Sequence, residues 1–573
     1  MKKIVTYYLK PYYSRMILEF FIKFLGTIMD LCLPWILAYM IDSVIPKESK
    51  TMIFYWGIIM LICSTFALTF NIIANRMASK VARNTTERIR HDLFEKIMYL
   101  SNKQTDFFTK PSLISRLTSD TYYIHQMLGR MQRLGVRAPI LLIGGIFITL
   151  TLDPVLTLVL VLVLPFLVLI ITKISRRSIP MYAKLQESTD QFVRLVREDI
   201  AGIRVIKALS KIGYEQKKFD AINKEVVERE KKAGMTMAVV DPLMHLLMNV
   251  GLIIVIVVGA YRVNQGQSEV GKILAFMTYF TVILNAMMSI SKMFVILSKS
   301  FASANRINAI LDSKEDFTII TEEQAENKPE QDMDAISFEH VSFSYNGAEN
   351  NLTDISFSLK KGETLGIIGE TGSGKTTIIH LLMRFYDTQK GKISIHGKDI
   401  KSIPLKELRS LFGVVFQNDA LFEDTITENI RLGRPLSEEE VENAVSYAQA
   451  KEFVEQKEGG YLEHLNIKGA NLSGGQKQRI LIARALAAHP DILILDDSSS
   501  ALDYKTDASL RKELKDHFKD TTTLIIAQRI SSIMQADHIL VLEDGNCIGY
   551  GTHEELMNTC SIYKEISQSQ MGV

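Results

Sequence analysis

The sequence predicts a multidomain protein in which a membrane domain of six helices precedes an α/β domain of P-loop type. Three observations predict this fold class: long apolar segments in roughly the first 300 residues, a later change to short strand-like runs, and a glycine-rich phosphate-binding motif. The chain has 573 residues, which is long enough for several domains.

Composition and charge exclude several other classes of protein. Hydrophobic residues make up 47% of the chain and charged residues 23%, values that exclude a disordered or collagen-like protein. The net charge of +2 is no basic excess of the kind that marks nucleic-acid-binding proteins, so no nucleic-acid partner is expected. The four cysteines share no metal-ligand spacing, which predicts reduced structural thiols. No cleavable signal peptide is evident, so the first apolar segment should stay attached.

Six segments have about the 20 apolar residues needed to cross a bilayer. They are roughly 16–41, 53–75, 135–152, 155–173, 240–261 and 271–297. Segment 76–134 carries 11 Lys or Arg residues and segment 173–239 carries 15, whereas the three short loops carry three in total. Because basic residues mark cytoplasmic loops, both long segments and both termini are predicted to be cytoplasmic. A multi-pass protein of the bacterial plasma membrane follows, with membrane lipid as a partner.

Polar residues inside apolar segments are candidate functional positions, because burying them in lipid is costly. Asp30 lies deep in the first segment without a neighbour of opposite charge. Asp241, His245 and Asn249 are spaced by four and share one helix face, which fits either packing against another helix or lining a cavity. Asn285 lies beside methionines, which fill cores and also suit varied apolar ligands. These five residues are the candidate substrate-cavity positions.

An acidic, polar stretch divides the chain. Residues 314–334 are rich in Glu, Asp and Gln, which predicts a solvated linker. The predicted domains are therefore a transmembrane domain at 1–313, this linker, and a nucleotide-binding domain at 335–573. Strand-like runs open the third part at Ala335–Phe343, Leu352–Leu359 and Thr364–Ile368.

Residues 369–376 match the P-loop pattern G-x-x-x-x-G-K-[ST], after a strand-like run and before a helical one. In such a loop, backbone N–H groups and a helix N-terminus surround phosphates, which predicts ATP as the ligand. Lys375 should reach the β- and γ-phosphates, and the Thr376 hydroxyl should bind Mg²⁺. The predicted nucleotide-binding residues here are Gly369, Glu370, Thr371, Gly372, Ser373, Gly374, Lys375, Thr376 and Thr377.

A second carboxylate-bearing strand completes the predicted magnesium site. The run 491–496 is apolar between its first and last residues and ends at Asp496. Ligands bind α/β sheets at the carboxyl ends of strands. Asp496 therefore fits the Walker-B role on Mg²⁺.

Between these two motifs lies Leu472-Ser473-Gly474-Gly475-Gln476, which resembles the signature of ATP-binding cassette (ABC) ATPases. Six spans followed by one such cassette resemble a half-transporter of the bacterial multidrug and lipid exporter group. The resemblance implies the ABC exporter fold over nearly the whole chain. Residues 108–120 and 198–219 resemble the two intracellular coupling segments of that group.

The resemblance also implies roles for single residues. Tyr345 resembles the aromatic residue that stacks on adenine, and Gln417 resembles the loop glutamine that touches Mg²⁺. Ser473, Gly475 and Gln476 resemble the residues that contact the γ-phosphate of ATP held by the other subunit. Residues 500–503 resemble the loop that links the two sites, so a dimer with two ATP molecules between its cassettes is implied.

The chain departs from the family pattern at three places. Asp497 stands where the family usually has Glu, and Gln528 stands where it usually has His. Aspartate is one methylene shorter, and a displacement near 1 Å can cost about 10²-fold in rate. Glutamine can donate a hydrogen bond to the γ-phosphate, but it cannot take up a proton or carry a charge at neutral pH. The segment Leu465–Gly469 also lacks the acidic residue that the family's exporters often have before the signature.

The resemblance implies an ATPase subunit of an ATP-driven exporter of amphipathic drugs or lipids. The departures, beside an intact signature, predict two unequal ATP sites. The chain's own Walker motifs would form a degenerate site, and its signature would complete the competent site of an unlike half-transporter. A homodimer with two weakened sites is an alternative. The motifs are also compatible with a specialised transporter of a peptide, thiol or siderophore, or with an ATP-gated channel or sensor.

Overall fold

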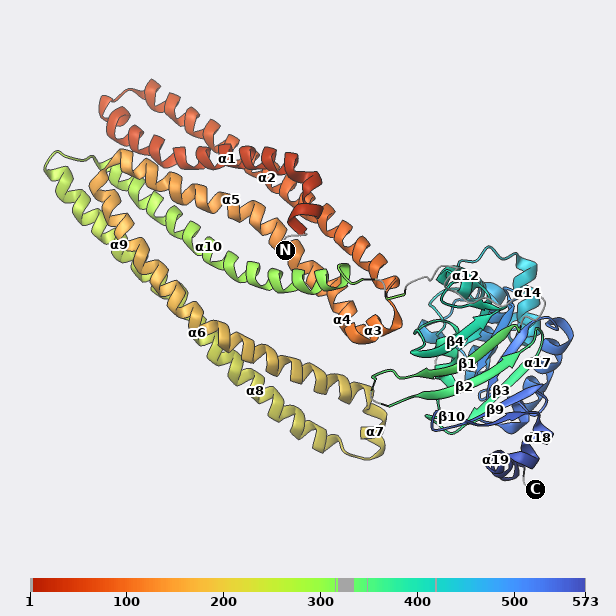
Figure 1. Ribbon diagram of the computed structural model, residues 1–573. Helices are drawn as coiled ribbons and strands as arrows, with labels where there is room; N and C mark the ends of the chain where they lie inside the picture. The colour runs from red at the N-terminus through yellow and green to blue at the C-terminus, as the bar shows by residue number, and fades with distance from the viewer. Residues whose placement is uncertain (1–3, 315, 318–333, 348, 418–419, 572–573) are drawn as a thin grey trace. The chain divides into compact units, whose positions relative to one another are not determined.

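The computed structural model describes residues 4–314, 316–317, 334–347, 349–417 and 420–571. The chain divides into a helical unit, Met1–Tyr99 with Thr109–Ser313, and an α/β unit, Leu100–Phe108 with Lys314–Val573 (Figure 1). Most of the predicted linker 314–334 lies outside the described residues.

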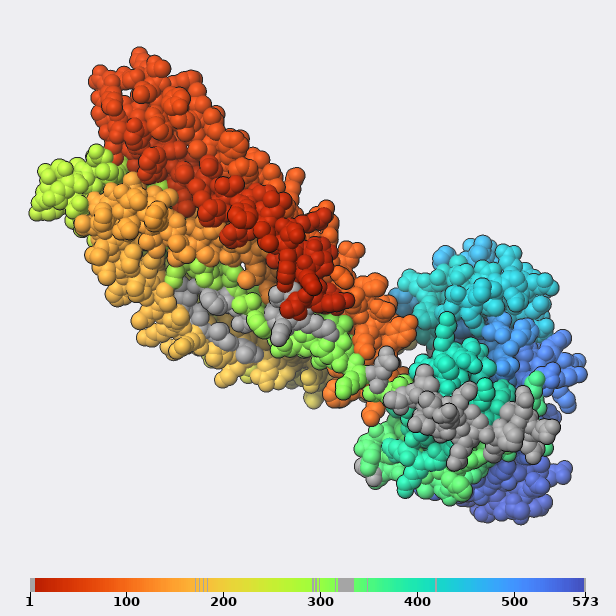
Figure 2. All heavy atoms as spheres, turned by 45° about the horizontal axis from the view of Figure 1, so that its top comes forward, coloured from red at the N-terminus to blue at the C-terminus, as the bar shows by residue number. Residues whose placement is uncertain are grey.

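Long helices build the helical unit. They are α1 (Tyr13–Tyr39), α2 (Lys50–Met98), α5 (Thr121–Leu152), α6 (Pro154–Ala201), α8 (Ile212–Ala238), α9 (Val240–Asn264) and α10 (Val270–Leu311), with the short α4 (Lys110–Ser115) and α7 (Ile203–Ala208) between them. Helices α1 and α2 pack side by side, and Figure 2 shows them in red along one face. Helix α5 packs on α10, and α6 packs on α8 (Figure 1).

Five stretches of the described residues are long and apolar enough to cross a membrane. They are Lys50–Met98, Lys110–Leu152, Pro154–Ala201, Ile212–Asn264 and Val270–Ile290. Helix α1 covers the first predicted span but is not among them, and it carries Glu19, Lys23 and Asp30. The count of six spans therefore stays a prediction. Helices α2 and α6, with 49 and 48 residues, are far longer than a bilayer requires.

A tight turn at residues 152–154 joins α5 to α6. Helix α5 ends at Leu152, and α6 begins at Pro154. The Asp153 carboxylate accepts hydrogen bonds from the N–H groups of Val155 (2.9 Å) and Leu156 (3.3 Å), which caps α6. Its second oxygen lies 3.1 Å from Nε of Arg262, so this buried carboxylate is charge-paired.

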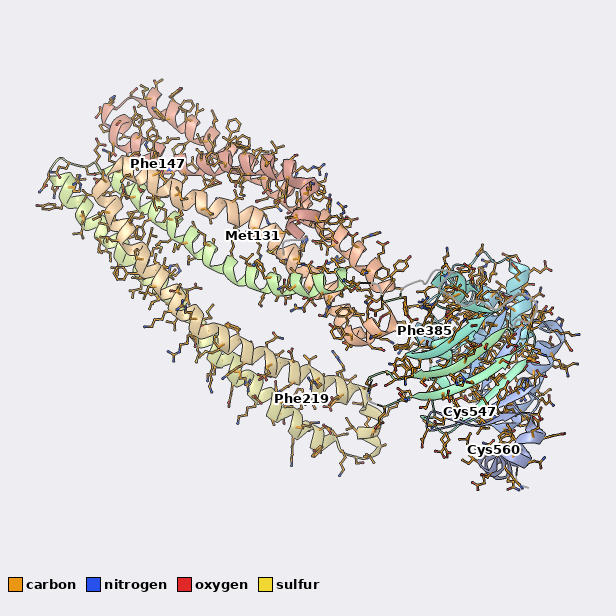
Figure 3. All side chains as sticks on the ribbon, viewed as in Figure 1. Met131, Phe147, Phe219, Phe385, Cys547 and Cys560 are labelled. Carbon is orange, nitrogen blue, oxygen red and sulfur yellow. The ribbon has the colours of Figure 1, made fainter. Side chains whose placement is uncertain are left out.

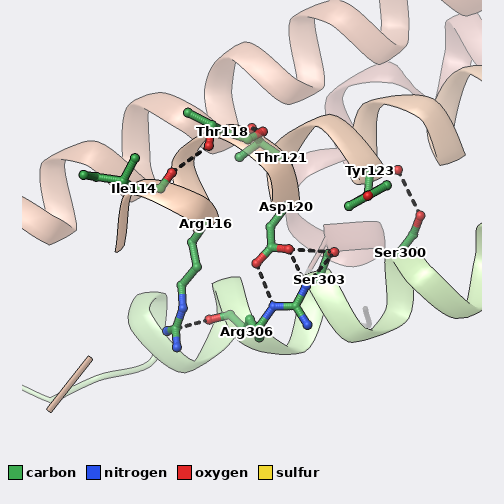
Figure 4. Close-up of polar contacts among 9 residues, drawn as sticks. All are labelled: Ile114, Arg116, Thr118, Asp120, Thr121, Tyr123, Ser300, Ser303 and Arg306. Atoms are coloured by element: carbon green, nitrogen blue, oxygen red, sulfur yellow. Dashed lines mark hydrogen bonds and ion pairs between the residues drawn. The ribbon is translucent and has the colours of Figure 1, made fainter. Parts of the chain in front are cut away.

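A buried carboxylate also ties α10 to the start of α5. Asp120 ends the π-helical turn η5 (Arg116–Asp120), and its side chain is only 2% exposed. Figure 4 shows it accepting hydrogen bonds from Ser303 Oγ (2.9 Å) and from Nε (2.8 Å) and Nη2 of Arg306. The bond to Asp120 raises the pKa of Arg306. This network fixes the last turns of α10 before the chain enters the linker.

Asp120→Ala is expected to destabilise the helical unit by about 2–3 kcal/mol, because Ser303 and Arg306 lose a charged acceptor. The midpoint of thermal unfolding of the purified full-length chain should fall. Asp220→Asn removes an exposed carboxylate on α8 and serves as the control, with an unchanged midpoint. Equal midpoints for Asp120→Ala and the unmodified chain would contradict this role.

Two sheets build the α/β unit. The strands are β1 (Ile336–Phe343), β2 (Leu352–Leu359), β3 (Thr364–Gly369), β4 (Lys390–Ile395), β5 (Lys398–Asp399), β6 (Phe412–Val415), β7 (Ile492–Asp496), β8 (Thr522–Ile526), β9 (His538–Glu543) and β10 (Asn546–Gly551). The antiparallel sheet has the order β2-β1-β4-β5. The larger sheet has the order β10-β9-β3-β8-β7-β6 and is parallel except at β10. The three predicted strand runs correspond to β1, β2 and β3.

Helices pack around these sheets and enclose an apolar core. They are α11 (Lys375–Leu382), α12 (Leu405–Ser410), α13 (Ile426–Arg431), α14 (Glu438–Tyr447), α15 (Lys451–Glu455), α16 (Gly474–Leu486), α17 (Tyr504–His517), α18 (His553–Thr559) and α19 (Ser561–Met571). The four cysteines of the chain are free, as predicted, and Figure 3 labels Cys547 and Cys560 in this unit. Burial raises the pKa of the Cys547 thiol, which keeps it unreactive.

Helix α3 (Asn102–Phe108) belongs to the α/β unit, although it lies between α2 and α4 in the sequence. The Tyr386 hydroxyl donates to Asp106 (2.6 Å), and Ser101 Oγ donates to Asp316 (2.7 Å). The α/β unit therefore includes residues 100–108, which end where residues 108–120, resembling the first coupling segment, begin.

Candidate nucleotide-binding site

The order of the larger sheet brings the predicted motifs to one edge. Strands β3, β8 and β7 are neighbours and run parallel, so the residues that follow them emerge at the same end. The P-loop follows β3, Gln528 follows β8, and Asp496 and Asp497 stand at the end of β7. This is the edge at which α/β sheets bind ligands.

The P-loop turns sharply between β3 and α11. Gly374 has φ +100°, and a Cβ there would lie 2.8 Å from the carbonyl oxygen of Asn351. Gly369, with φ +158°, would bring a Cβ to 2.2 Å from the carbonyl oxygen of Leu542. Both positions therefore require glycine. Ser373 Oγ is buried and has no hydrogen-bond partner among the described residues, and a phosphate oxygen would satisfy it.

Lys375 and Thr376 lie at the start of α11, beside the P-loop backbone and Asp496. Lys375 Nζ donates to the carbonyl oxygens of Gly369 (2.7 Å) and Glu370 (2.6 Å), so its charge is held over the loop. Burial lowers the pKa of Lys375. Thr376 Oγ1 lies 3.3 Å from Oδ2 of Asp496. A hydroxyl beside a carboxylate offers the hard oxygen ligands that Mg²⁺ prefers.

Asp496 is nearly fully buried, at 2% exposure. Burial raises its pKa, while hydrogen bonds from Thr376 and from the backbone N–H of Gln417 act in the opposite direction. The carboxylate thus takes up a proton at a higher pH than usual, and a divalent cation would favour the ionised form. Gln417 is exposed, and its backbone contact with Asp496 brings it close to this pair, which is compatible with its expected place near the metal.

Tyr345 lies in an aromatic group that sequence analysis did not predict. Its hydroxyl lies 3.0 Å from His380 Nδ1 and 3.5 Å from Thr377 Oγ1. Its ring meets the Tyr386 ring edge-on, with centroids 5.0 Å apart. Since Tyr386 also donates to Asp106 on α3, the candidate adenine-binding residue is one aromatic contact away from that helix. No motif marks Asp106 or Tyr386, because the contact joins residues 280 positions apart.

The signature residues form the start of α16. Ser473 is the N-cap of this helix: its Oγ accepts from the N–H of Gln476 (3.3 Å), and Gln476 Oε1 accepts from the N–H of Ser473 (3.0 Å). A Cβ on Gly475 would lie 3.0 Å from the carbonyl oxygen of Ala501, which places the loop 500–503 beside the signature. None of the hydrogen bonds described for these residues reaches the P-loop of the same chain.

The two departures from the family pattern meet directly. Gln528 Nε2 donates to Asp497 Oδ2 over 3.0 Å. Asp497 has φ +52°, and its N–H donates to the carbonyl oxygen of Ile526 (2.9 Å). This backbone contact fixes the position of the Asp497 Cα, from which the short side chain extends. The carboxylate that would orient an attacking water is therefore engaged by a neutral amide.

The altered segment Leu465–Gly469 ends in a short 3-10 turn, Ile467–Gly469. Leu465 is buried, and its N–H donates to the carbonyl oxygen of Asp424 (2.9 Å). Ile467 is 66% exposed, and Lys468 adopts φ +57°. The segment thus presents an apolar and a basic side chain where the family often has an acidic one.

Asp30 and Asn285 line one cavity of about 450 Å³ in the helical unit. Asp30 is charge-paired: Arg137 Nη2 lies 2.9 Å from Oδ2, and Asn71 donates to the same oxygen over 3.2 Å. The remaining lining is mostly apolar and includes Leu33, Leu134, Leu141 and Val282.

Asp241, His245 and Asn249 do not line this cavity. All three side chains are exposed along α9 in the single chain. His245 borders a separate small pocket with Met244, Met248 and Met288. The shared helix face was predicted from spacing, but the five candidate cavity residues do not form one site.

Two family models match the chain. Residues 16–287 match the model described as ABC transporter transmembrane region, and residues 352–500 match the model described as ABC transporter. The ABC transporter ATP-binding protein YfiB of Bacillus subtilis (strain 168) is 34% identical over 99% of this chain and 98% of its own length. Another protein of that bacterium, YknU, is 36% identical over 84% of this chain and 82% of its own. Rv1273c of Mycobacterium tuberculosis is 30% identical over 98% and 97%.

A solved structure shares the fold. The chain is similar to a bacterial Atm1-family ABC exporter with ATP bound, with a TM-score of 0.82 and 23% identity over 97% of this chain and 98% of that chain. This likeness supports the predicted combination of a helical exporter-type membrane domain with an α/β nucleotide-binding domain.

Proposed function

Because the chain belongs to the ABC transporter family, we propose that it is one subunit of an ATP-driven exporter of amphipathic small molecules or lipids across the plasma membrane. The supporting observation is the single edge of the larger sheet at which Lys375, Thr376 and Asp496 meet. The apolar cavity in the helical unit supplies a space for the transported molecule.

The chemistry is transfer of the γ-phosphoryl group of ATP to water, which depends on positioning and on charge. Lys375 and the P-loop N–H groups would hold the phosphates, and Tyr345 would stack on adenine. Thr376, Gln417 and Asp496 would hold Mg²⁺, which neutralises charge on the phosphates when bound. The buried Ser373 hydroxyl gives the loop one more free donor.

This chain's own site is proposed to be degenerate. Asp497 is shorter than glutamate by about 1.5 Å, one carbon–carbon bond. It also accepts a hydrogen bond from Gln528, which cannot carry a proton in its place. ATP would therefore stay bound at this P-loop, while hydrolysis proceeds mainly at a second site.

The second site would combine this chain's signature with the Walker motifs of an unlike half-transporter. The capped start of α16 is intact, and its bonds described here do not involve the P-loop of its own chain. Closure of two cassettes on ATP would then move the coupling segments and turn the cavity outward. Hydrolysis at the competent site would reset the pair.

The purified full-length chain should bind Mg²⁺-ATP but hydrolyse it slowly by itself. Co-purification with its partner half-transporter should raise turnover, and the pair in proteoliposomes should move the dye Hoechst 33342 in an ATP-dependent way. Brisk hydrolysis by this chain alone would contradict the degenerate site. ATP turnover without dye movement would contradict export of amphipathic cations and direct the search to other substrates.

Asp30→Asn is expected to lower dye transport about tenfold while changing basal ATP hydrolysis by less than about twofold. Its charge holds Arg137 at the cavity wall, and its loss leaves a cation unpaired in the membrane domain. Asp241→Asn is the matched control, since it removes a carboxylate outside the cavity. Equal transport by both variants would show that the Asp30 charge serves packing only.

A further inference from the structure

The last described helix of the chain holds the loop that carries Gln528. Gln570, on α19, donates from Nε2 to the carbonyl oxygen of Gln528 (2.8 Å). Its Oε1 accepts from the backbone N–H of Ile530 (2.8 Å). One side-chain amide therefore binds the backbone on both sides of Arg529.

This loop has left the sheet where Gln570 binds it. Strand β8 ends at Ile526, and the Ala527 N–H makes a last bond to Ile367 (3.2 Å). The 3-10 turn η8 begins only at Ile530, and the side chains of Gln528 and Arg529 are exposed. The Gln570 side chain thus provides hydrogen-bond partners for the Gln528 carbonyl and the Ile530 N–H, which neither strand β8 nor turn η8 provides.

Helix α19 is anchored well enough to serve as a fixed support. Tyr563 is fully buried, and its hydroxyl lies 2.7 Å from Nδ1 of His553 on α18. Tyr563 packs in the same apolar cluster as Ala527, Ile530 and Ile533, which flank the loop. The base of α19 and the loop therefore share one core, and Gln570 extends that contact to the loop backbone.

We propose that Gln570 is a positioning residue that holds the Gln528 backbone so that its side chain engages Asp497. Gln570 thereby sets how long ATP is retained at this chain's own P-loop. Two hydrogen bonds connect these residues. Gln570 donates to the Gln528 carbonyl oxygen, and Gln528 Nε2 donates to Asp497 Oδ2 over 3.0 Å. This inference rests on the proposed ATP-retaining site.

Release of mant-ATP from the full-length chain, chased with unlabelled Mg²⁺-ATP, tests the proposal. Gln570→Ala removes two hydrogen bonds and should speed release about tenfold. Gln570→Glu keeps the acceptor for the Ile530 N–H but loses the donor to Gln528, so it should also speed release. Gln568→Ala is the matched control: Gln568 is exposed on the same helix, with no hydrogen bond described, and release should be unchanged.

A double-mutant cycle separates positioning from general stability. In a Gln528→Ala background, Gln570→Ala should change release no further, because the side chain that it positions is gone. Fully additive effects, or equal release by Gln570→Ala and the unmodified chain, would overturn the proposal while leaving the degenerate site standing. Failure of the unmodified chain to retain mant-ATP would overturn both.

Discussion

Asp497→Glu combined with Gln528→His is expected to raise ATP hydrolysis at this chain's own site by about 10²-fold. The longer carboxylate regains the reach to an attacking water, and a displacement near 1 Å is worth about that factor. Histidine restores a side chain that can accept and donate protons near neutral pH. The exchange also removes the amide that now engages Asp497.

Phosphate release from the full-length chain, alone and with its partner, measures this effect. Asp497→Glu alone should give a smaller gain, because Gln528 still donates to the carboxylate. Asp516→Glu makes the same chemical change on the exposed side of α17 and should leave turnover unaltered. No gain from the double variant would show that reach and proton transfer do not limit this site.

Ser473→Ala is expected to lower ATP turnover of the assembled pair by about 10²-fold, the usual cost of removing a donor that faces developing charge. ATP binding at this chain's own P-loop should persist, because the signature is proposed to act on the partner's nucleotide. Steady-state hydrolysis and mant-ATP binding, measured on the same preparation, separate the two effects.

A second capped helix offers a close control for this substitution. Ser437 caps α14 with the same box geometry, in which Glu440 takes the place of Gln476. Either serine-to-alanine change should cost about 1 kcal/mol of stability through the lost cap. Full turnover in both variants would contradict the assigned role of Ser473, whereas equal loss in both would reduce it to a helix cap.

Local patterns indicated which motifs would meet at one edge of the larger sheet. The phosphate loop, its lysine and the Walker-B carboxylate follow short buried strands, and parallel strands bring their carboxyl ends together. The family models and relatives confirm the resemblance to ABC transporters. The bond between Gln528 and Asp497 joins the two departures from the family pattern, because the neighbouring strands β7 and β8 end beside each other.

Contacts between distant segments could not be predicted in the same way. Asp30 was predicted to lack a local partner, and its partner Arg137 comes from another helix. Spacing by four showed that Asp241, His245 and Asn249 share a face, but it does not say which way that face points. The contacts of Tyr386 and Gln570 depend on tertiary packing, and no periodicity or motif in the sequence predicts them.

Because α3 belongs to the α/β unit, the boundaries of a protein fragment affect which contacts of that unit are kept. A soluble fragment that starts near residue 334 would lack Asp106 and leave the Tyr386 hydroxyl to solvent. Hybrid transporters assembled by joining two parents at the linker would likewise mismatch this pair unless both positions came from one parent. Nucleotide affinity should therefore be measured on the full-length protein or on a fragment of the α/β unit that also contains α3.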